Sequence, residues 1–122
     1  MSNSPDLSPE ILWRRALAEG RFLLQRDKTT GLAIFPPRLD FSGDGQVEWI
    51  EASGRGTVYA VTLIAQRPPA EAHVVVLVDL EEGPRLMSTV EGIAPESVHI
   101  GMAVRAHISA DADEARLVFH PA

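Results

Sequence analysis

The chain of 122 residues contains no cysteine, so disulfides are impossible and every zinc site built from thiolates is excluded. No apolar run approaches the roughly 20 residues needed to cross a bilayer. The first residues also lack the basic and apolar segments of a secretory signal. These absences predict a single cytoplasmic domain that is not bound to a membrane. At this length the domain can bury a hydrophobic core without disulfide bonds.

Positive charge is scarce in the second half of the chain. The formal net charge is −6, with seven basic and eight acidic residues in 1–60 but four and nine in 61–122. An anionic ligand is therefore expected to meet the N-terminal half, where six of the basic residues lie between positions 14 and 38. Part of this cluster has an ordinary explanation, because Glu10 and Arg14 are spaced to pair on a helix.

Catalytic signatures are missing as well. The sequence has no Gly-x-Ser-x-Gly elbow and no Walker-type phosphate loop. The four histidines are scattered without the spacing of metal ligands and are read as strand-surface residues: His73, His99, His107 and His120. We therefore predict that the protein is not an enzyme and has no catalytic residues.

The pattern of apolar residues changes once along the chain. Ser8 followed by Pro9 predicts a helix start and Gly20 its end, with Trp13 on the apolar stripe. From residue 21 onward the period is two, which predicts strands at 22–26, 32–35, 47–52, 57–66, 73–80, 85–91, 103–110 and 116–119. A short helix and five or more late antiparallel strands favour a small barrel, with the OB-fold as the leading candidate.

The segment DFSGDGQVEWIE at 40–51 matches the calcium loop of an EF-hand at most ligand places. The flanking helices are missing from the sequence, because paired prolines precede the loop and two glycines follow it. A polar turn that leads into a strand is therefore the preferred interpretation.

Five segments, taken in order, carry a resemblance to a known family. They are AEGRFLLQR at 18–26, FPPR at 35–38, Trp49 with SGRGTVY at 53–59, VDLEEGPRLM at 78–87, and IGMAV at 100–104 with FHP at 119–121. The chain resembles the acyl-CoA-associated family, long catalogued as domain of unknown function thirty-five, that joins a rubredoxin-like zinc ribbon to an OB-fold. The resemblance implies a mainly β protein with an N-terminal helix and ribbon region at 1–46 and a five-stranded OB-fold barrel at 47–122.

The chain departs from this family at the metal. Two Cys-x-x-Cys pairs hold zinc in the family, but here the first pair is replaced by Asp27 and Thr30, and the second falls near Leu39 and Ser42. These side chains cannot replace thiolates around zinc. The resemblance thus implies a degenerate zinc ribbon without metal, and the calcium-like loop is its remnant. We expect this lobe to be the most mobile part of the molecule and to be held by packing of Phe22, Leu24, Ile34, Phe35 and Trp49.

The resemblance also implies a function. It predicts a non-catalytic accessory protein that binds or scaffolds a thiolase-like or other acyl-CoA-processing enzyme, with no tightly bound cofactor but with CoA or acyl-CoA as a ligand. Arginine forks suit the phosphates of CoA. The predicted ligand-binding residues lie at family motif positions: Phe35, Pro37, Arg38, Gly54, Arg55, Gly56, Tyr59 and Arg85.

Two alternatives stay open. Arg55 and Arg85 can instead form structural ion pairs with the acidic strands, and the two glycines can serve only to bend the first barrel strand. An OB-fold can also bind single-stranded nucleic acid, which needs a positive groove lined with exposed aromatic residues. The acidic barrel half and the small number of aromatics argue against that second function. The oligomeric state is left open.

Overall fold

A computed structural model describes residues 8–37, 47–68, 72–109 and 115–122. It opens with helix α1 (Pro9–Ala18), whose predicted N-cap is confirmed because Ser8 Oγ accepts a hydrogen bond from the Ile11 amide at 3.3 Å. The helix ends at Ala18, and Gly20, two residues further on, adopts a left-handed conformation (φ 82°) that other residues rarely tolerate. No helix within these ranges is long and apolar enough to cross a bilayer.

A small antiparallel sheet follows, with the order β2-β1-β3: β1 (Leu23–Asp27), β2 (Ala33–Ile34) and β3 (Val47–Glu51). The turn from β1 to β2 falls where the family that the sequence resembles has its first cysteine pair. Asp27 Oδ1 accepts hydrogen bonds from the amides of Thr29 at 2.8 Å and Thr30 at 3.3 Å. Thr30 Oγ1 in turn accepts from the Leu32 amide at 3.2 Å. Side-chain capping of the turn thus occupies both residues that replace the cysteines.

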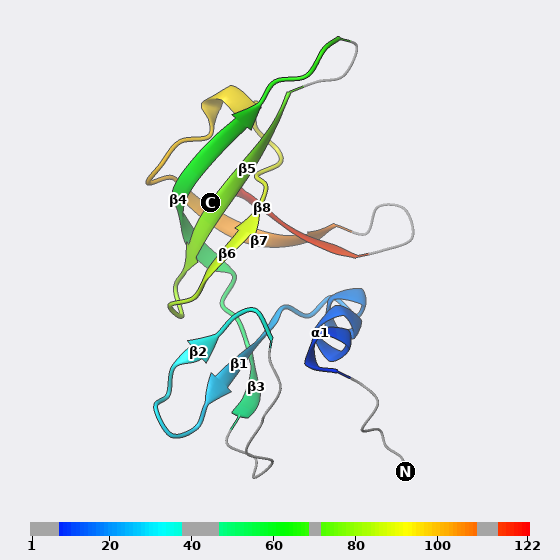
Figure 1. The fold of residues 1–122 in the computed structure, drawn as a ribbon, viewed down its shortest axis with the longest axis vertical. Helices are drawn as coiled ribbons and strands as arrows, with labels where there is room; N and C mark the ends of the chain where they lie inside the picture. The colour runs from blue at the N-terminus through cyan, green and yellow to red at the C-terminus, as the bar shows by residue number, and fades with distance from the viewer. Residues whose placement is uncertain (1–7, 38–46, 69–71, 110–114) are drawn as a thin grey trace.

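The second sheet contains β4 (Arg55–Ile64), β5 (His73–Leu80), β6 (Arg85–Ser88), β7 (Ala103–Ser109) and β8 (Arg116–Pro121), in the order β6-β5-β4-β7-β8. A short 3-10 helix, η2 (Pro95–Ser97), precedes β7. Beyond β6, a parallel bridge joins Val90 to Phe119, and the Phe119 amide donates to Thr89 O at 2.9 Å. This bridge brings the two ends of the sheet together, so the predicted five-stranded OB-fold barrel is confirmed (Figure 1).

The bulge in the long first barrel strand lies at Tyr59. The pairing of β4 with β5 shifts between Val58 and Ala60, so Tyr59 is the extra residue. We expected the irregularity at Gly54 and Gly56, where the strand begins. The alternation of apolar and polar residues predicts that a strand forms, but it does not predict where in the strand a bulge falls.

One hydrophobic core spans the barrel and part of the small sheet. Phe22 and Leu24 pack in the same buried cluster as the barrel valines and Phe119. The packing role expected of Ile34 and Trp49 is not confirmed, because both pair with Gln25 in register and so lie on the face opposite Leu24. The two are half-buried and do not belong to the core cluster.

Trp13 packs helix α1 against the small sheet. The indole Nε1 donates to Leu23 O at 2.8 Å, and the ring meets Phe22 and Phe35 edge to face at centroid distances of 6.5 and 5.5 Å. The sequence pattern predicted a packing role for this tryptophan, and the contacts confirm it. Figure 1 shows α1 beside the small sheet, at the foot of the barrel.

Candidate functional site

The predicted ligand-binding residues fall in two places. Gly54, Arg55, Gly56, Tyr59 and Arg85 belong to β4, β6 and the approach to β4, whereas Phe35 and Pro37 follow β2 beside α1. Arg38 lies outside the described residues. Arg55 and Gly56 line one hollow, and Phe35 and Pro37 line a different one, so the structure does not unite the two groups in one hollow.

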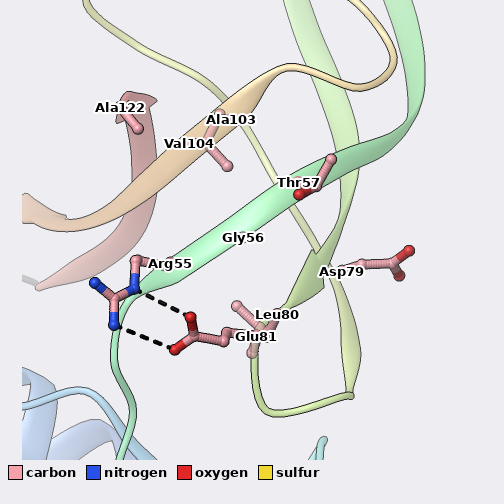
Figure 2. Close-up of a pocket in the computed structure, with 9 residues that line it drawn as sticks. All are labelled: Arg55, Gly56, Thr57, Asp79, Leu80, Glu81, Ala103, Val104 and Ala122. Atoms are coloured by element: carbon pink, nitrogen blue, oxygen red, sulfur yellow. Dashed lines mark hydrogen bonds and ion pairs between the residues drawn. The ribbon is translucent and has the colours of Figure 1, made fainter.

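Arg55 borders a hollow of about 470 Å³ at the junction of β4, β5 and β7, shown in Figure 2. Its guanidinium faces the carboxylate of Glu81, with Nε 3.2 Å from Oε2 and a terminal nitrogen 3.5 Å from Oε1. Asp79 also lines the hollow, but Figure 2 shows its carboxylate turned away from Arg55, and it pairs with Arg85 instead. A phosphate placed here would have to displace Glu81 from Arg55.

The Arg85 guanidinium is held by Asp79 at its edge and by the Tyr59 ring on one face. Its Nε donates to Asp79 Oδ1 at 2.6 Å and a terminal nitrogen to Oδ2 at 3.3 Å, while the guanidinium carbon lies 3.4 Å from the centroid of the Tyr59 ring. The hydrogen bond to Asp79 raises the pKa of Arg85 further above its already high usual value. Asp79 and Arg85 are register partners on β5 and β6, so cross-strand pairing accounts for the contact.

The two predicted glycines meet packing demands. A Cβ atom at Gly56 would stand 2.6 Å from Val78 Cγ1 and 3.0 Å from Asp79 O. Gly54 has a φ of 83°, which favours glycine. Packing against β5 and backbone conformation are therefore sufficient reasons for glycine at both positions.

Phe35 and Pro37 line a hollow of about 240 Å³ together with Glu10, Trp13 and Arg14 of α1. A second hollow of about 210 Å³ shares Trp13, Arg14 and Phe35 and continues onto the barrel at Leu86, Met87, Arg116 and Leu117. Because they share three lining residues, the two hollows adjoin along one trough, named here the helix–barrel groove. Sequence patterns did not single out Met87 or Arg116, since their place in the groove depends on how α1 packs near β6 and β8.

The histidines include one pair that sequence spacing does not reveal. His107 on β7 and His120 on β8 stack with ring centroids 4.3 Å apart. Within the described ranges, no three histidine, aspartate or glutamate residues are grouped to hold a metal.

The described part of the calcium-like loop is strand β3. This strand occupies the last five places of the loop, and the loop's opening residues, 40–46, are not described. Its candidate ligand Glu48 accepts from Arg26 Nε at 2.8 Å. The other, Glu51, lies 3.7 Å from Arg21. An EF-hand needs a helix leaving the loop, so the strand contradicts that alternative.

Comparison with known proteins agrees with this architecture. The sequence model of the rubredoxin-like zinc ribbon domain of ChsH2 matches residues 14–48, and that of the ChsH2 C-terminal OB-fold domain matches residues 49–109. Among solved structures, the Ltp2-ChsH2(DUF35) aldolase superposes with a TM-score of 0.77 at 30% identity, covering 99% of this chain and 98% of the other.

Two curated relatives add context. A probable enoyl-CoA hydratase alpha subunit of Thermomonospora curvata is 36% identical over 117 residues, which are 90% of this chain but 36% of the relative. This chain thus spans about a third of that relative's length. A DUF35 domain-containing scaffold protein of Methanocaldococcus jannaschii is 28% identical over 88% of this chain and 83% of its own length. The chain therefore belongs to the ChsH2 family, in which a rubredoxin-like zinc ribbon precedes a C-terminal OB-fold, and here the ribbon has lost its cysteines.

Proposed function

We propose that the protein is a non-catalytic accessory subunit that scaffolds a thiolase-like or related acyl-CoA-processing enzyme. The observation that carries the proposal is the end-to-end structural likeness to the Ltp2-ChsH2(DUF35) aldolase, at 30% identity and with nearly complete coverage of both chains. The scaffold name of the archaeal relative points in the same direction. CoA or acyl-CoA is the ligand that such an enzyme would present to the subunit.

Exposed apolar side chains on the barrel support a docking role. Ile100 is 67% exposed, Tyr59 49% and Leu63 47%. The Gly101 amide donates to Val58 O at 2.8 Å. Because Gly101 follows Ile100 and Val58 precedes Tyr59, this hydrogen bond places the Ile100 and Tyr59 segments side by side. Burying such apolar side chains against a partner lowers the free energy of the complex.

Co-purification tests the proposal directly. The tagged full-length chain, expressed in its native host, is expected to retain a stoichiometric acyl-CoA enzyme that mass spectrometry identifies as thiolase-like, aldolase or hydratase. Ile100→Glu should weaken retention by about tenfold or more if Ile100 is covered, because a buried unpaired carboxylate is strongly unfavourable. Thr62→Glu, an exposed change on the same barrel, is the matched control.

Three outcomes would contradict the proposal. Retention of single-stranded nucleic acid through moderate salt, with no enzyme partner, would favour the OB-fold's other common function. Thioester turnover by the purified chain alone would contradict the non-catalytic role. Recovery of the chain without any acyl-CoA enzyme would contradict the scaffold role.

A further inference from the structure

A row of basic residues crosses three neighbouring strands of the barrel. Arg55 on β4 is the register partner of Arg105 on β7, and Arg105 is in turn the register partner of His120 on β8. Directly opposite residues of antiparallel strands project from the same face of the sheet, with Cβ atoms about 5 Å apart. His107, two residues beyond Arg105, stacks on His120 with ring centroids 4.3 Å apart. These four residues are named here the basic row.

The basic row lies on the outer face of the barrel. Val104 and Phe119, the neighbours of Arg105 and His120 along their strands, are 1% and 0% exposed and belong to the core. Because successive side chains of a strand point to opposite faces, Arg105 and His120 point away from the core. Arg105 is exposed, and so is the side chain of Arg55. A partner molecule can therefore reach the row.

Arg105 has no counter-charge within the described part of the chain. No carboxylate there forms an ion pair with it, although six other arginines each have one. Its register partners on the two sides are Arg55 and His120, neither of which is ever negative. Like charges directly opposite each other on neighbouring strands are destabilising. Arg105 therefore destabilises the isolated chain unless an anionic partner covers it.

The acidic side chains beside the row already have partners. Glu81 faces Arg55, with Nε 3.2 Å from Oε2 (Figure 2). Glu51 shares a hollow with His107, but it lies 3.7 Å from Arg21. Neither carboxylate is therefore free to balance the charge of the row.

The surroundings of Arg105 suit an extended anionic surface better than a small anion. Arg105 lies outside the hollows beside Arg55 and His107 and outside the helix–barrel groove, so no concave site encloses it there. With strands about 4.8 Å apart, the row spans about 10 Å, which is wider than one phosphate group. An acidic peptide segment can place carboxylates along such a row, and arginine binds carboxylates in a forked geometry.

The row also continues the exposed apolar surface of the barrel. Strand β7 begins after the turn that holds Ile100, and Ala103 and Arg105 occupy alternate, exposed positions along it. A protein that covers Ile100 and follows β7 therefore reaches Arg105. Nucleic acid fits this location less well, because an OB-fold binds oligonucleotides on the face of its second and third strands. These are β5 and β6 here, where Asp79 is exposed to the partner and would repel phosphates.

We propose that the basic row docks an acidic segment on the surface of the partner enzyme. This inference rests on the proposed function for the identity of the partner. It deepens that function by naming the charge of the surface that the partner presents. The chain has a net charge of −6, so an acidic segment is repelled by most of the molecule and attracted at the row. That contrast favours one orientation of the two proteins.

Arg105→Glu and Arg105→Gln test the row by two opposed measurements. Both should raise the melting temperature of the purified full-length chain, by about 1–4 °C for the charge reversal, because repulsion from Arg55 is relieved. Both should weaken retention of the acyl-CoA enzyme from the host, by about tenfold for Arg105→Glu and by less for Arg105→Gln. A lower melting temperature in both variants would show that Arg105 has a structural role, and would overturn the inference.

Lys28→Glu is the matched control. Lys28 is an exposed residue in the turn between β1 and β2, without an ion pair among the described residues, and its replacement changes the net charge by the same amount. It should alter enzyme retention by less than about twofold, since exposed charges at a distance are screened. If Lys28→Glu weakens retention as much as Arg105→Glu, the net charge alone decides and the row proposal is overturned.

Three anionic probes identify what the row binds: hexaglutamate, inorganic phosphate and oligothymidylate. Hexaglutamate should bind the wild-type chain at low salt, and Arg105→Glu should weaken that binding by about tenfold. Tighter binding of phosphate than of hexaglutamate would overturn the proposal in favour of a small-anion site. Tighter binding of oligothymidylate, lost in Arg105→Glu, would overturn it in favour of nucleic acid.

The result can be separated from a failure of the proposed function. If the wild type and Arg105→Glu retain the acyl-CoA enzyme equally, the inference about the row falls and the scaffold role stands. If hexaglutamate binds and Arg105→Glu abolishes its binding, but no acyl-CoA enzyme is retained from the host, the row stands as a site for acidic segments and the scaffold role falls.

Discussion

The backbone of Gly56 on β4 lies directly against the side chain of Val78 on β5, since a Cβ atom at position 56 would stand 2.6 Å from Val78 Cγ1. Val78 is fully buried in the centre of the hydrophobic core. The neighbouring Asp79 O would be 3.0 Å away and belongs to the backbone, so it cannot rotate aside. This close approach gives glycine at position 56 a structural role, whatever its part in ligand binding.

Gly56→Ala should therefore destabilise the fold by about 1–3 kcal/mol, the usual cost of forcing an extra carbon into a packed interior. Urea denaturation followed by circular dichroism will measure the change in the free energy of unfolding. Thr57→Ala, an exposed change at the next residue, is the control and should have a much smaller effect. Wild-type stability in Gly56→Ala, combined with lost acyl-CoA binding, would instead support a direct role in the ligand site.

Arg85→Lys should lower the melting temperature even though it keeps the positive charge. A lysine cannot lie flat on the Tyr59 ring while holding both Asp79 oxygens, as the guanidinium does. The same replacement should cost less in a Tyr59→Leu background, where the stacking is already lost. An identical loss in both backgrounds, measured in a double-mutant cycle, would show that the ring and the guanidinium are not coupled.

The contribution of Arg85 should not vary with pH through the neutral and mildly alkaline range. Its pKa is raised in the folded protein, chiefly by the hydrogen bond to Asp79, so the stabilisation is complete below the unfolded pKa and is lost only above it. Both pKa values lie far above neutrality. The difference in melting temperature between wild type and Arg85→Lys should thus be the same at pH 7 and pH 9.

Asp27→Ala should destabilise the protein by about 1 kcal/mol, because two backbone amides of the turn lose their acceptor. Asp27 Oδ1 receives both of these hydrogen bonds, from Thr29 and Thr30. Lys28→Ala in the same turn removes an exposed side chain and is the matched control. Equal denaturation midpoints for the two variants would argue that the cysteine-to-aspartate replacement has no capping role.

Sequence patterns predicted the positions of the helix and strands better than the side-chain contacts between them. Ser8 and Pro9 mark the start of α1 by local chemistry, and alternating side chains place the barrel strands within a few residues. The ion pair between Arg85 and Asp79 depends on the strand register across a turn, which alternation alone does not determine.

The site was harder to predict than the fold for the same reason. Phe35 and Pro37 were predicted from family motifs, but their neighbours in the groove come from α1 and from β6 and β8. Arg116 lies about a hundred residues from Arg14 in the sequence and joins it only through tertiary packing. No pattern of neighbouring residues in the sequence predicts that these two arginines lie close together.

Zinc, calcium and EDTA should leave the melting temperature unchanged. The chain has no thiolates for zinc, and the last five places of the calcium-like loop form β3, with Glu48 and Glu51 near arginines. An ion that bound the folded state would stabilise it by about 2.7 kcal/mol at one hundred times its dissociation constant. Differential scanning calorimetry with each addition will detect a change of that size, and such a rise with zinc or calcium would show that a metal site persists.

Hydrogen exchange should separate the zinc-free sheet from the barrel. Among the residues that the structure describes, strand β2 is an edge strand of two residues paired only to β1, whereas β5 lies between β4 and β6 and points Val74, Val76 and Val78 into the core. The amides of Ala33 and Ile34 should therefore exchange through local opening, at a lower free energy than the amide of Val76, which should require global unfolding. Equal protection in the two strands would contradict this, and would mean that the small sheet and the barrel unfold as one unit despite the lost metal. Leu24 provides an internal reference, because it is 1% exposed within the shared core and its protection should follow the barrel even though it belongs to β1.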